Sequence, residues 1–126
     1  MNNIWLIGSG EMSQDYARIL EGLDKEYLVI GRGENSAKIF KKETNHDVII
    51  GGLEAYLASM PKMCSHAIIS VGVEALYKTT KSLLEYGVKN ILVEKPGAML
   101  IEEFDDLVNL TEDSDANVLV AYNRRF

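Results

Sequence analysis

A glycine loop near the N-terminus is the first part of this sequence with residue types that could bind a ligand. Its residues are Gly8, Ser9, Gly10, Glu11 and Met12. Gly8 permits a sharp turn out of the apolar run 4–7, and Gly10 lets the backbone approach a pyrophosphate without a Cβ in the way. A helix beginning at residue 11 would offer free N–H groups and a positive dipole end to that anion. In this position the loop predicts dinucleotide binding, although a Gly-x-Gly pair alone also occurs in ordinary tight turns.

Two residues of the loop depart from the usual dinucleotide pattern. Ser13 stands where a third glycine is common, and we expect it to loosen the packing of helix on strand slightly without blocking the phosphate. Glu11 suits a helix N-terminus but would repel phosphates if its side chain turned inward.

The end of the second apolar run, residues 27–30, bears on the choice of cofactor. NAD sites usually place an acid there for the ribose 2′-hydroxyl, about 20 residues after the loop. This chain instead has Gly31 and Arg32, and Glu34 comes later, in the next expected helix. Arg32 can form two parallel hydrogen bonds to a 2′-phosphate or stack on adenine. The sequence therefore favours NADP and leaves NAD possible, the alternative being a solvated turn with an incidental arginine.

The triplet Glu94, Lys95, Pro96 ends another apolar run, residues 91–93. Ligands of open α/β sheets bind at the carboxyl ends of the strands. A proline there ends the strand and fixes the turn. A lysine so held could bind a substrate hydroxyl or move its proton. A surface pair at the end of a strand is the simpler alternative.

Six short apolar runs alternate with amphipathic segments along the chain. The runs are residues 4–7, 27–30, 48–50, 67–69, 91–93 and 118–121, and the helical segments are 11–20, 34–44, 53–58, 74–86 and 101–110. This alternation predicts an α/β fold, a doubly wound, mostly parallel six-stranded sheet (Rossmann fold) in three α/β/α layers, with both faces covered. A flavodoxin-like strand order stays open. In the helix 11–20, the apolar residues expected near one face are Met12, Tyr16, Ile19 and Leu20. In the helix 101–110, the residues expected to face inward are Phe104, Leu107, Val108 and Leu110.

Composition excludes several classes of protein. The 126 residues fit one domain. The net charge of −6 without a basic block argues against nucleic-acid binding. There is no apolar run long enough to cross a membrane and no signal peptide, so we expect a cytoplasmic protein. A single cysteine, Cys64, allows neither an intrachain disulfide nor a thiolate zinc cluster. His46 and His66 precede expected strands, away from the ligand edge, and no metal site is predicted.

The glycine loop, the triplet and the closing residues 121–126 together resemble the N-terminal domain of the Gfo/Idh/MocA (glucose–fructose oxidoreductase / inositol dehydrogenase) family. The resemblance spans essentially the whole chain and implies an NAD(P)-dependent oxidoreductase acting on CH–OH groups of sugars, inositols or related polyols. It implies that Lys95 is catalytic, in proton transfer or substrate binding, and that Glu94 and Pro96 belong to the cofactor site. Asn123 and Arg124 would approach the nicotinamide end of the cofactor.

The family pattern is not complete in this sequence. After the fourth strand the family commonly has Thr-Pro and then a histidine, whereas this chain has neither, so only Ser70 and Val71 are expected to line the cofactor there. Family members continue into a second α/β domain with most substrate contacts, a catalytic histidine and usually the oligomer interface. The resemblance thus implies that residues 1–126 bind the nucleotide but are catalytically incomplete alone, within a longer protein that is a homo-oligomer.

Two other functions remain open on the sequence. A free-standing NAD(P)-binding sensor or regulatory module would need no lysine at a hydride site, so Lys95 weakly favours the enzyme. A methyltransferase using S-adenosylmethionine usually needs an acid after the second strand, and Gly31 with Arg32 argues against it.

Overall fold

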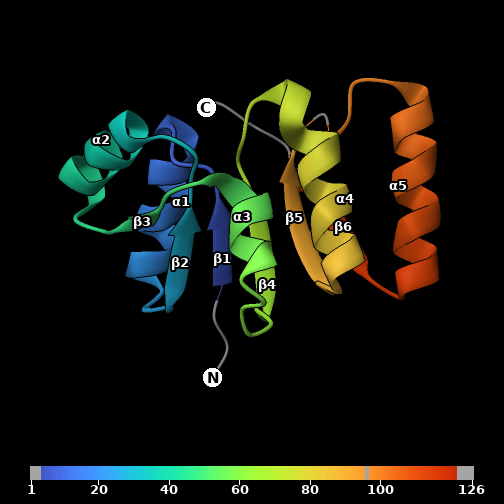
Figure 1. Ribbon diagram of the computed structural model, residues 1–126, viewed down its shortest axis with the longest axis horizontal. Coiled ribbons are helices and arrows are strands. Elements are labelled where there is room, and N and C mark those ends of the chain that lie inside the picture. Colours follow the sequence, from blue (N-terminus) through green and yellow to red (C-terminus); the bar gives the residue numbers. More distant parts are fainter. Residues whose placement is uncertain (1–3, 96, 122–126) are drawn as a thin grey trace.

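The computed structural model describes residues 4–95 and 97–121, and they form alternating strands and helices (Figure 1). The strands are β1 (Ile4–Ile7), β2 (Tyr27–Ile30), β3 (Val48–Ile49), β4 (His66–Ile69), β5 (Asn90–Glu94) and β6 (Asn117–Ala121). The helices are α1 (Glu11–Gly22), α2 (Glu34–Thr44), α3 (Gly52–Ala58), α4 (Leu76–Tyr86) and α5 (Ile101–Ser114), with a 3₁₀ turn over Val73–Ala75 before α4.

The six strands form one sheet in the order β3-β2-β1-β4-β5-β6, and every pairing is parallel. This order confirms the doubly wound Rossmann arrangement and excludes the flavodoxin-like order. The chain reverses direction across the sheet between β1 and β4, which is the point where such folds bind their ligands. Ile7 is level with Ile30 on one side and with Ile69 on the other, so three carboxyl ends meet at one edge.

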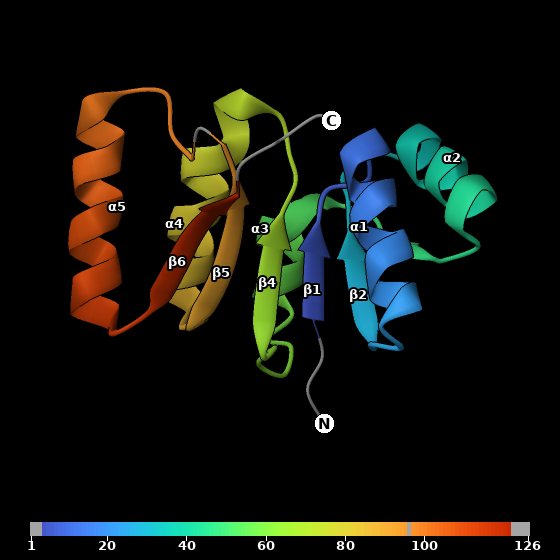
Figure 2. The ribbon, with the colours of Figure 1, turned by 180° about the vertical axis from the view of Figure 1, so that it is seen from behind.

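Alternate residues of each strand supply two cores, one on each face of the sheet. The larger core lies under α3, α4 and α5 and includes Trp5, Ile69 and Leu83. The smaller core lies under α1 and α2 and includes Leu6 and Phe40, both fully buried (Figure 2). Successive residues of β1, such as Leu6 and Ile7, therefore face opposite cores, as the strand period of two predicts.

The layer formed by α1 and α2 covers only part of its face of the sheet, which corrects the expectation that both faces are covered throughout. Among the described residues, no helix lies over β5 and β6 on this side (Figure 2). A groove of about 580 Å³ is found there, lined partly by Ile68, Leu92 and Leu119. Leu119 is 66% exposed. We call these three residues the open half-face.

Two helices bury only part of the apolar face that the sequence predicts for each of them. In α1 the buried residues are Ser13, Gln14, Ala17 and Leu20, whereas Ile19 is 57% exposed. Small residues face the sheet because they allow α1 to lie close to it. In α5, Leu107 is buried as expected but Val108 is exposed. Within residues 4–95 and 97–121, no helix is both long and apolar enough to cross a bilayer.

Candidate functional site

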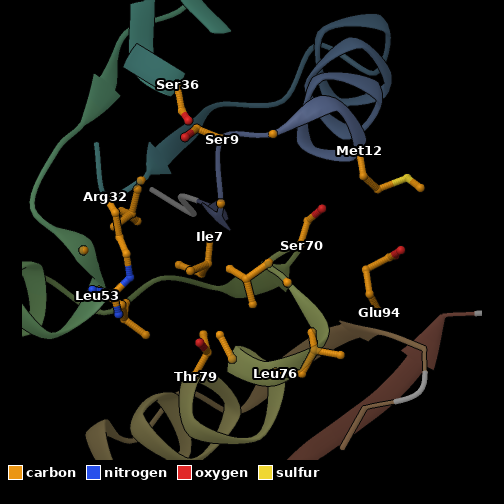
Figure 3. Close-up of a pocket in the computed structure, with 18 of the residues that line it drawn as sticks. Ile7, Ser9, Met12, Arg32, Ser36, Leu53, Ser70, Leu76, Thr79 and Glu94 are labelled. Atoms are coloured by element: carbon orange, nitrogen blue, oxygen red, sulfur yellow. The ribbon is translucent and has the colours of Figure 1, made fainter. Parts of the chain in front are cut away.

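A cleft of about 590 Å³ lies along the carboxyl edge of the sheet, where the loops after β1, β2, β3, β4 and β5 meet (Figure 3). That volume lies within the range of roughly 300–1,000 Å³ usual for small-molecule sites. The residues that the sequence predicts for the site and that line the cleft are Gly8, Ser9, Gly10, Glu11, Met12, Gly31, Arg32, Ser70, Val71, Glu94 and Lys95. Pro96, Asn123 and Arg124 lie outside the described residues.

Gly8 is required by the turn itself. Its φ is +116°, and a Cβ at this position would lie 2.0 Å from the carbonyl oxygen of Ser70. Its N–H donates to the carbonyl of Ile30 at 2.8 Å. The residue is therefore held between the ends of β2 and β4, and only glycine fits there.

Gly10 has a different environment, which provides the test of whether a dinucleotide fits. It is the N-cap residue of α1, with φ −87° and ψ −168°. A Cβ at Gly10 would meet no atom within 4 Å. Nothing inside the chain needs a glycine here, yet the residue lines the cleft beside the unsatisfied N–H groups of the first helical turn. This open backbone fits a pyrophosphate, as the sequence predicts.

Ser13 ties α1 to the sheet. It is fully buried, and its hydroxyl donates to the carbonyl of Ser70 at 3.3 Å. The expected loosening at this position is replaced by a direct link between α1 and the end of β4. Ser9 packs against Gly31, where an added Cβ would lie 2.6 Å from the Ser9 hydroxyl oxygen.

Arg32 lies at the β2 end of the cleft and reaches toward α3 (Figure 3). Its Nη2 is 3.3 Å from Oε1 of Glu54. The sequence shows no carboxylate where β2 ends, but the fold brings one to that place from α3. The two residues are 22 positions apart, so no local pattern reveals the pair.

Glu94 and Lys95 follow β5 at the same edge. Glu94 is half-buried and accepts a hydrogen bond from the hydroxyl of Tyr16 on α1. Burial, the hydrogen bond and the Glu94 charge all raise the pKa of Tyr16 above its ordinary value. Lys95 is exposed, and its backbone N–H donates to the carbonyl of Ala121 of β6 at 3.2 Å. The sequence predicts Tyr16 only as part of the apolar face of its helix, whereas the structure shows its hydroxyl bound to the Glu94 carboxylate.

Several other residues line the cleft that sequence reasoning does not single out. They come from the start of α3 and from the first turn of α4, and include Leu53, Glu54, Leu76 and Thr79. The sequence signal for the part of the cleft after β3 is the pair Gly51 and Gly52, which resembles Gly31 after β2, because glycines at strand ends mark close approaches of the backbone.

The remaining chemistry-bearing side chains lie away from this edge. His66 begins β4, and His46, just before β3, stacks on the ring of Tyr27 at 4.2 Å. Cys64 is 6% exposed, and burial raises the pKa of its thiol to about 11. Across the described part of the chain, no group of three or more His, Cys, Asp or Glu residues is arranged to hold a metal ion.

A glycine loop between β1 and α1, at the switch point of a β3-β2-β1-β4-β5-β6 sheet, defines a dinucleotide-binding domain. Residues 2–122 match the sequence model of GFO_IDH_MocA, described as an oxidoreductase family with an NAD-binding Rossmann fold. The chain belongs to this Gfo/Idh/MocA family. No curated protein sequence matches the chain.

Solved structures with the same fold include three that differ in ligand or activity. An oxidoreductase from Agrobacterium radiobacter in complex with NAD+, L-tartaric acid and magnesium is 17% identical, with a TM-score of 0.84 over 98% of this chain and 36% of that one. UDP-N-acetylglucosamine 3-dehydrogenase from Acidithiobacillus ferrooxidans is 18% identical, with a TM-score of 0.77 over 94% and 37%. Biliverdin reductase from Synechocystis sp. PCC 6803, in complex with biliverdin and NADP+, is 17% identical, with a TM-score of 0.74 over 94% and 37%. The chain thus spans about a third of the length of these proteins.

Proposed function

We propose that this chain is the cofactor domain of an NAD(P)-dependent oxidoreductase acting on a CH–OH group of a sugar, inositol or related polyol. The observation that carries the proposal is the open backbone of Gly10 in the same cleft as Lys95. Bound nicotinamide would supply hydride acceptance and donation. Membership of an oxidoreductase family supports the reaction class, and the sugar-nucleotide dehydrogenase among the similar structures supports the substrate class.

The chain's own residues divide the work by position. The loop of Gly8 to Met12 and the N-terminus of α1 would hold the pyrophosphate, with Ser70 and Val71 beside them. The Tyr16 hydroxyl fixes the Glu94 carboxylate at the β5 end of the cleft, where it would accept a hydrogen bond from a ribose hydroxyl. The Lys95 ammonium would hold the substrate hydroxyl and take part in moving its proton. Pro96, Asn123 and Arg124 are proposed for the cofactor site on the family pattern alone.

Arg32 supports a preference for NADP, with NAD also accepted. Its side chain lines the cleft just past the end of β2, where a guanidinium can bond a 2′-phosphate. Among the similar structures, one is a complex with NAD+ and another a complex with NADP+, so both cofactors occur on this fold.

We also propose that a further domain completes the enzyme and that residues 1–126 alone turn over little substrate. The similar structures are about three times as long, and the open half-face leaves Leu119 exposed for something to cover. That domain would supply substrate contacts, and the longer protein would be a homo-oligomer. We propose the cytoplasm as its location, because a lone unpaired thiol such as Cys64 suits a reducing compartment.

Turnover by the full-length protein tests the oxidoreductase assignment. With NAD(P)+ and a panel of polyols, nicotinamide absorbance should report oxidation of at least one of them. Lys95→Ala should lower kcat by about 10²- to 10⁴-fold, while the exposed Lys78 on α4, replaced by alanine, should leave it unchanged. Saturable cofactor binding with no turnover of any polyol would refute the enzyme and favour a nucleotide sensor.

A further inference from the structure

The β2 end of the cleft contains two side chains that favour different cofactors, one of them NAD and the other NADP. In Rossmann domains a carboxylate near this point accepts a hydrogen bond from the ribose 2′-hydroxyl, and an arginine accommodates the 2′-phosphate of NADP. This chain has both, since Arg32 and Glu54 line the cleft together. They are also paired, with Nη2 of Arg32 3.3 Å from Oε1 of Glu54.

Backbone contacts hold the pair in place. Gly52 N–H donates to the carbonyl of Gly31 at 2.8 Å, and Gly51 N–H donates to the carbonyl of Arg32 at 3.2 Å. The Arg32 side chain then crosses Gly52, where an added Cβ would lie 3.3 Å from Nη1. The guanidinium is therefore directed along the start of α3 toward Glu54.

We infer that Glu54 is a cofactor-selectivity residue whose carboxylate competes with the 2′-phosphate of NADP for the guanidinium of Arg32. The inference rests on the proposed function, because it assumes that a dinucleotide occupies the cleft. A 2′-phosphate approaching Arg32 must displace the carboxylate or lie beside a like charge. NAD carries no 2′-phosphate, so its binding does not need the pair to open.

Exposure sets the expected size of the effect. The side chains of Arg32 and Glu54 are 74% and 60% exposed, and exposed ion pairs are weak. A 2′-phosphate with two negative charges can therefore displace the Glu54 carboxylate from Arg32. The competition weakens NADP binding but does not prevent it. Removing the carboxylate charge should strengthen NADPH binding by about 3- to 10-fold.

The experiment compares NADPH and NADH binding to the 126-residue chain by nicotinamide fluorescence. In Glu54→Gln we expect the Kd for NADPH to fall by about 3- to 10-fold and the Kd for NADH to stay within about twofold. Glu34→Gln is the matched control, since Glu34 is exposed on α2 and carries the same charge but is not among the residues lining the cleft. It should change both Kd values by less than about twofold.

A second background separates competition for Arg32 from general charge effects. In the Arg32→Ala variant, NADPH should no longer bind more tightly than NADH. Adding Glu54→Gln to this variant should strengthen NADPH binding by about twofold or less, because only screened repulsion between Glu54 and the 2′-phosphate remains. An equal gain in both backgrounds, or an equal change for NADH and NADPH, would overturn the inference. If the folded wild-type chain binds neither cofactor, the proposed function fails and the inference with it. Binding of both cofactors with no response to Glu54→Gln overturns the inference alone.

Discussion

Gly8 and Gly10 offer a test in which two alanine substitutions, two residues apart, should have opposite consequences. At Gly10, φ −87° and ψ −168° are accessible to alanine, and the new Cβ meets nothing within 4 Å. Gly10→Ala should therefore change the free energy of unfolding by no more than about 1 kcal/mol, because the smaller chain entropy that alanine loses on folding is opposed by the preference for glycine over alanine at an N-cap.

The same methyl group should weaken cofactor binding, because it stands where the backbone of α1 is open to the cleft. Loss of one hydrogen bond to a charged phosphate corresponds to about 1.5–3 kcal/mol. The Kd for NADPH should therefore rise by roughly 10- to 150-fold.

Gly8→Ala should instead destabilise the fold. Its Cβ would lie 2.0 Å from the carbonyl oxygen of Ser70, at a φ of +116° that strains any L side chain. Relief requires β1 and β4 to separate at the centre of the sheet. We expect a loss on the order of 3–5 kcal/mol, a large part of the roughly 5–15 kcal/mol that stabilises a typical domain.

Urea unfolding followed by tryptophan fluorescence measures both effects on stability, since Trp5 is the only tryptophan and is 1% exposed. NADPH titration of each folded variant measures the effect on binding. Wild-type affinity in Gly10→Ala would refute the assignment of this loop to the pyrophosphate. Wild-type stability in Gly8→Ala would refute the described contact between Gly8 and Ser70.

Three further measurements check other parts of the structure. Cys64, 6% exposed and with its thiol pKa raised to about 11, should react with a thiol reagent at neutral pH far more slowly in the native chain than in urea; equal rates would contradict its burial. The folded-state pKa values of Tyr16 and Tyr27 are raised above their ordinary value of about 10, so folding keeps their protons, and the contribution of these two tyrosines to stability should be constant below about pH 10 and be lost above it. The fall should be smaller in Tyr27→Phe, and a stability that rises with pH in that range would contradict the sign. Leu119→Ser should cost less than about 0.5 kcal/mol in residues 1–126 and about 2 kcal/mol in the full-length protein, whereas equal small costs would argue against a covered half-face.

Local pattern is sufficient to predict the elements of this fold and most of the residues that line the cleft. Unbroken apolar runs such as Ile4–Ile7 indicate parallel strands, and several of the glycines that follow these runs line the cleft. The order of the strands stays open on the sequence, because alternation along a chain does not specify which strands pair. The apolar face of α1 is only partly correct: Leu20 is buried as expected, but close packing on the sheet selects Ser13 and Ala17 over the larger Ile19.

The sequence alone determined the class of fold and the place of the glycine loop, since both depend on the order of residues within single strand–loop–helix units. Only the tertiary structure paired Arg32 with Glu54 and Tyr16 with Glu94, residues separated by 22 and 78 positions. It also left Leu119 exposed, although its run has the composition of a buried strand. The physical reason is the same in each case: contacts between distant segments depend on how helices lie on the sheet, and periodicity describes one segment at a time.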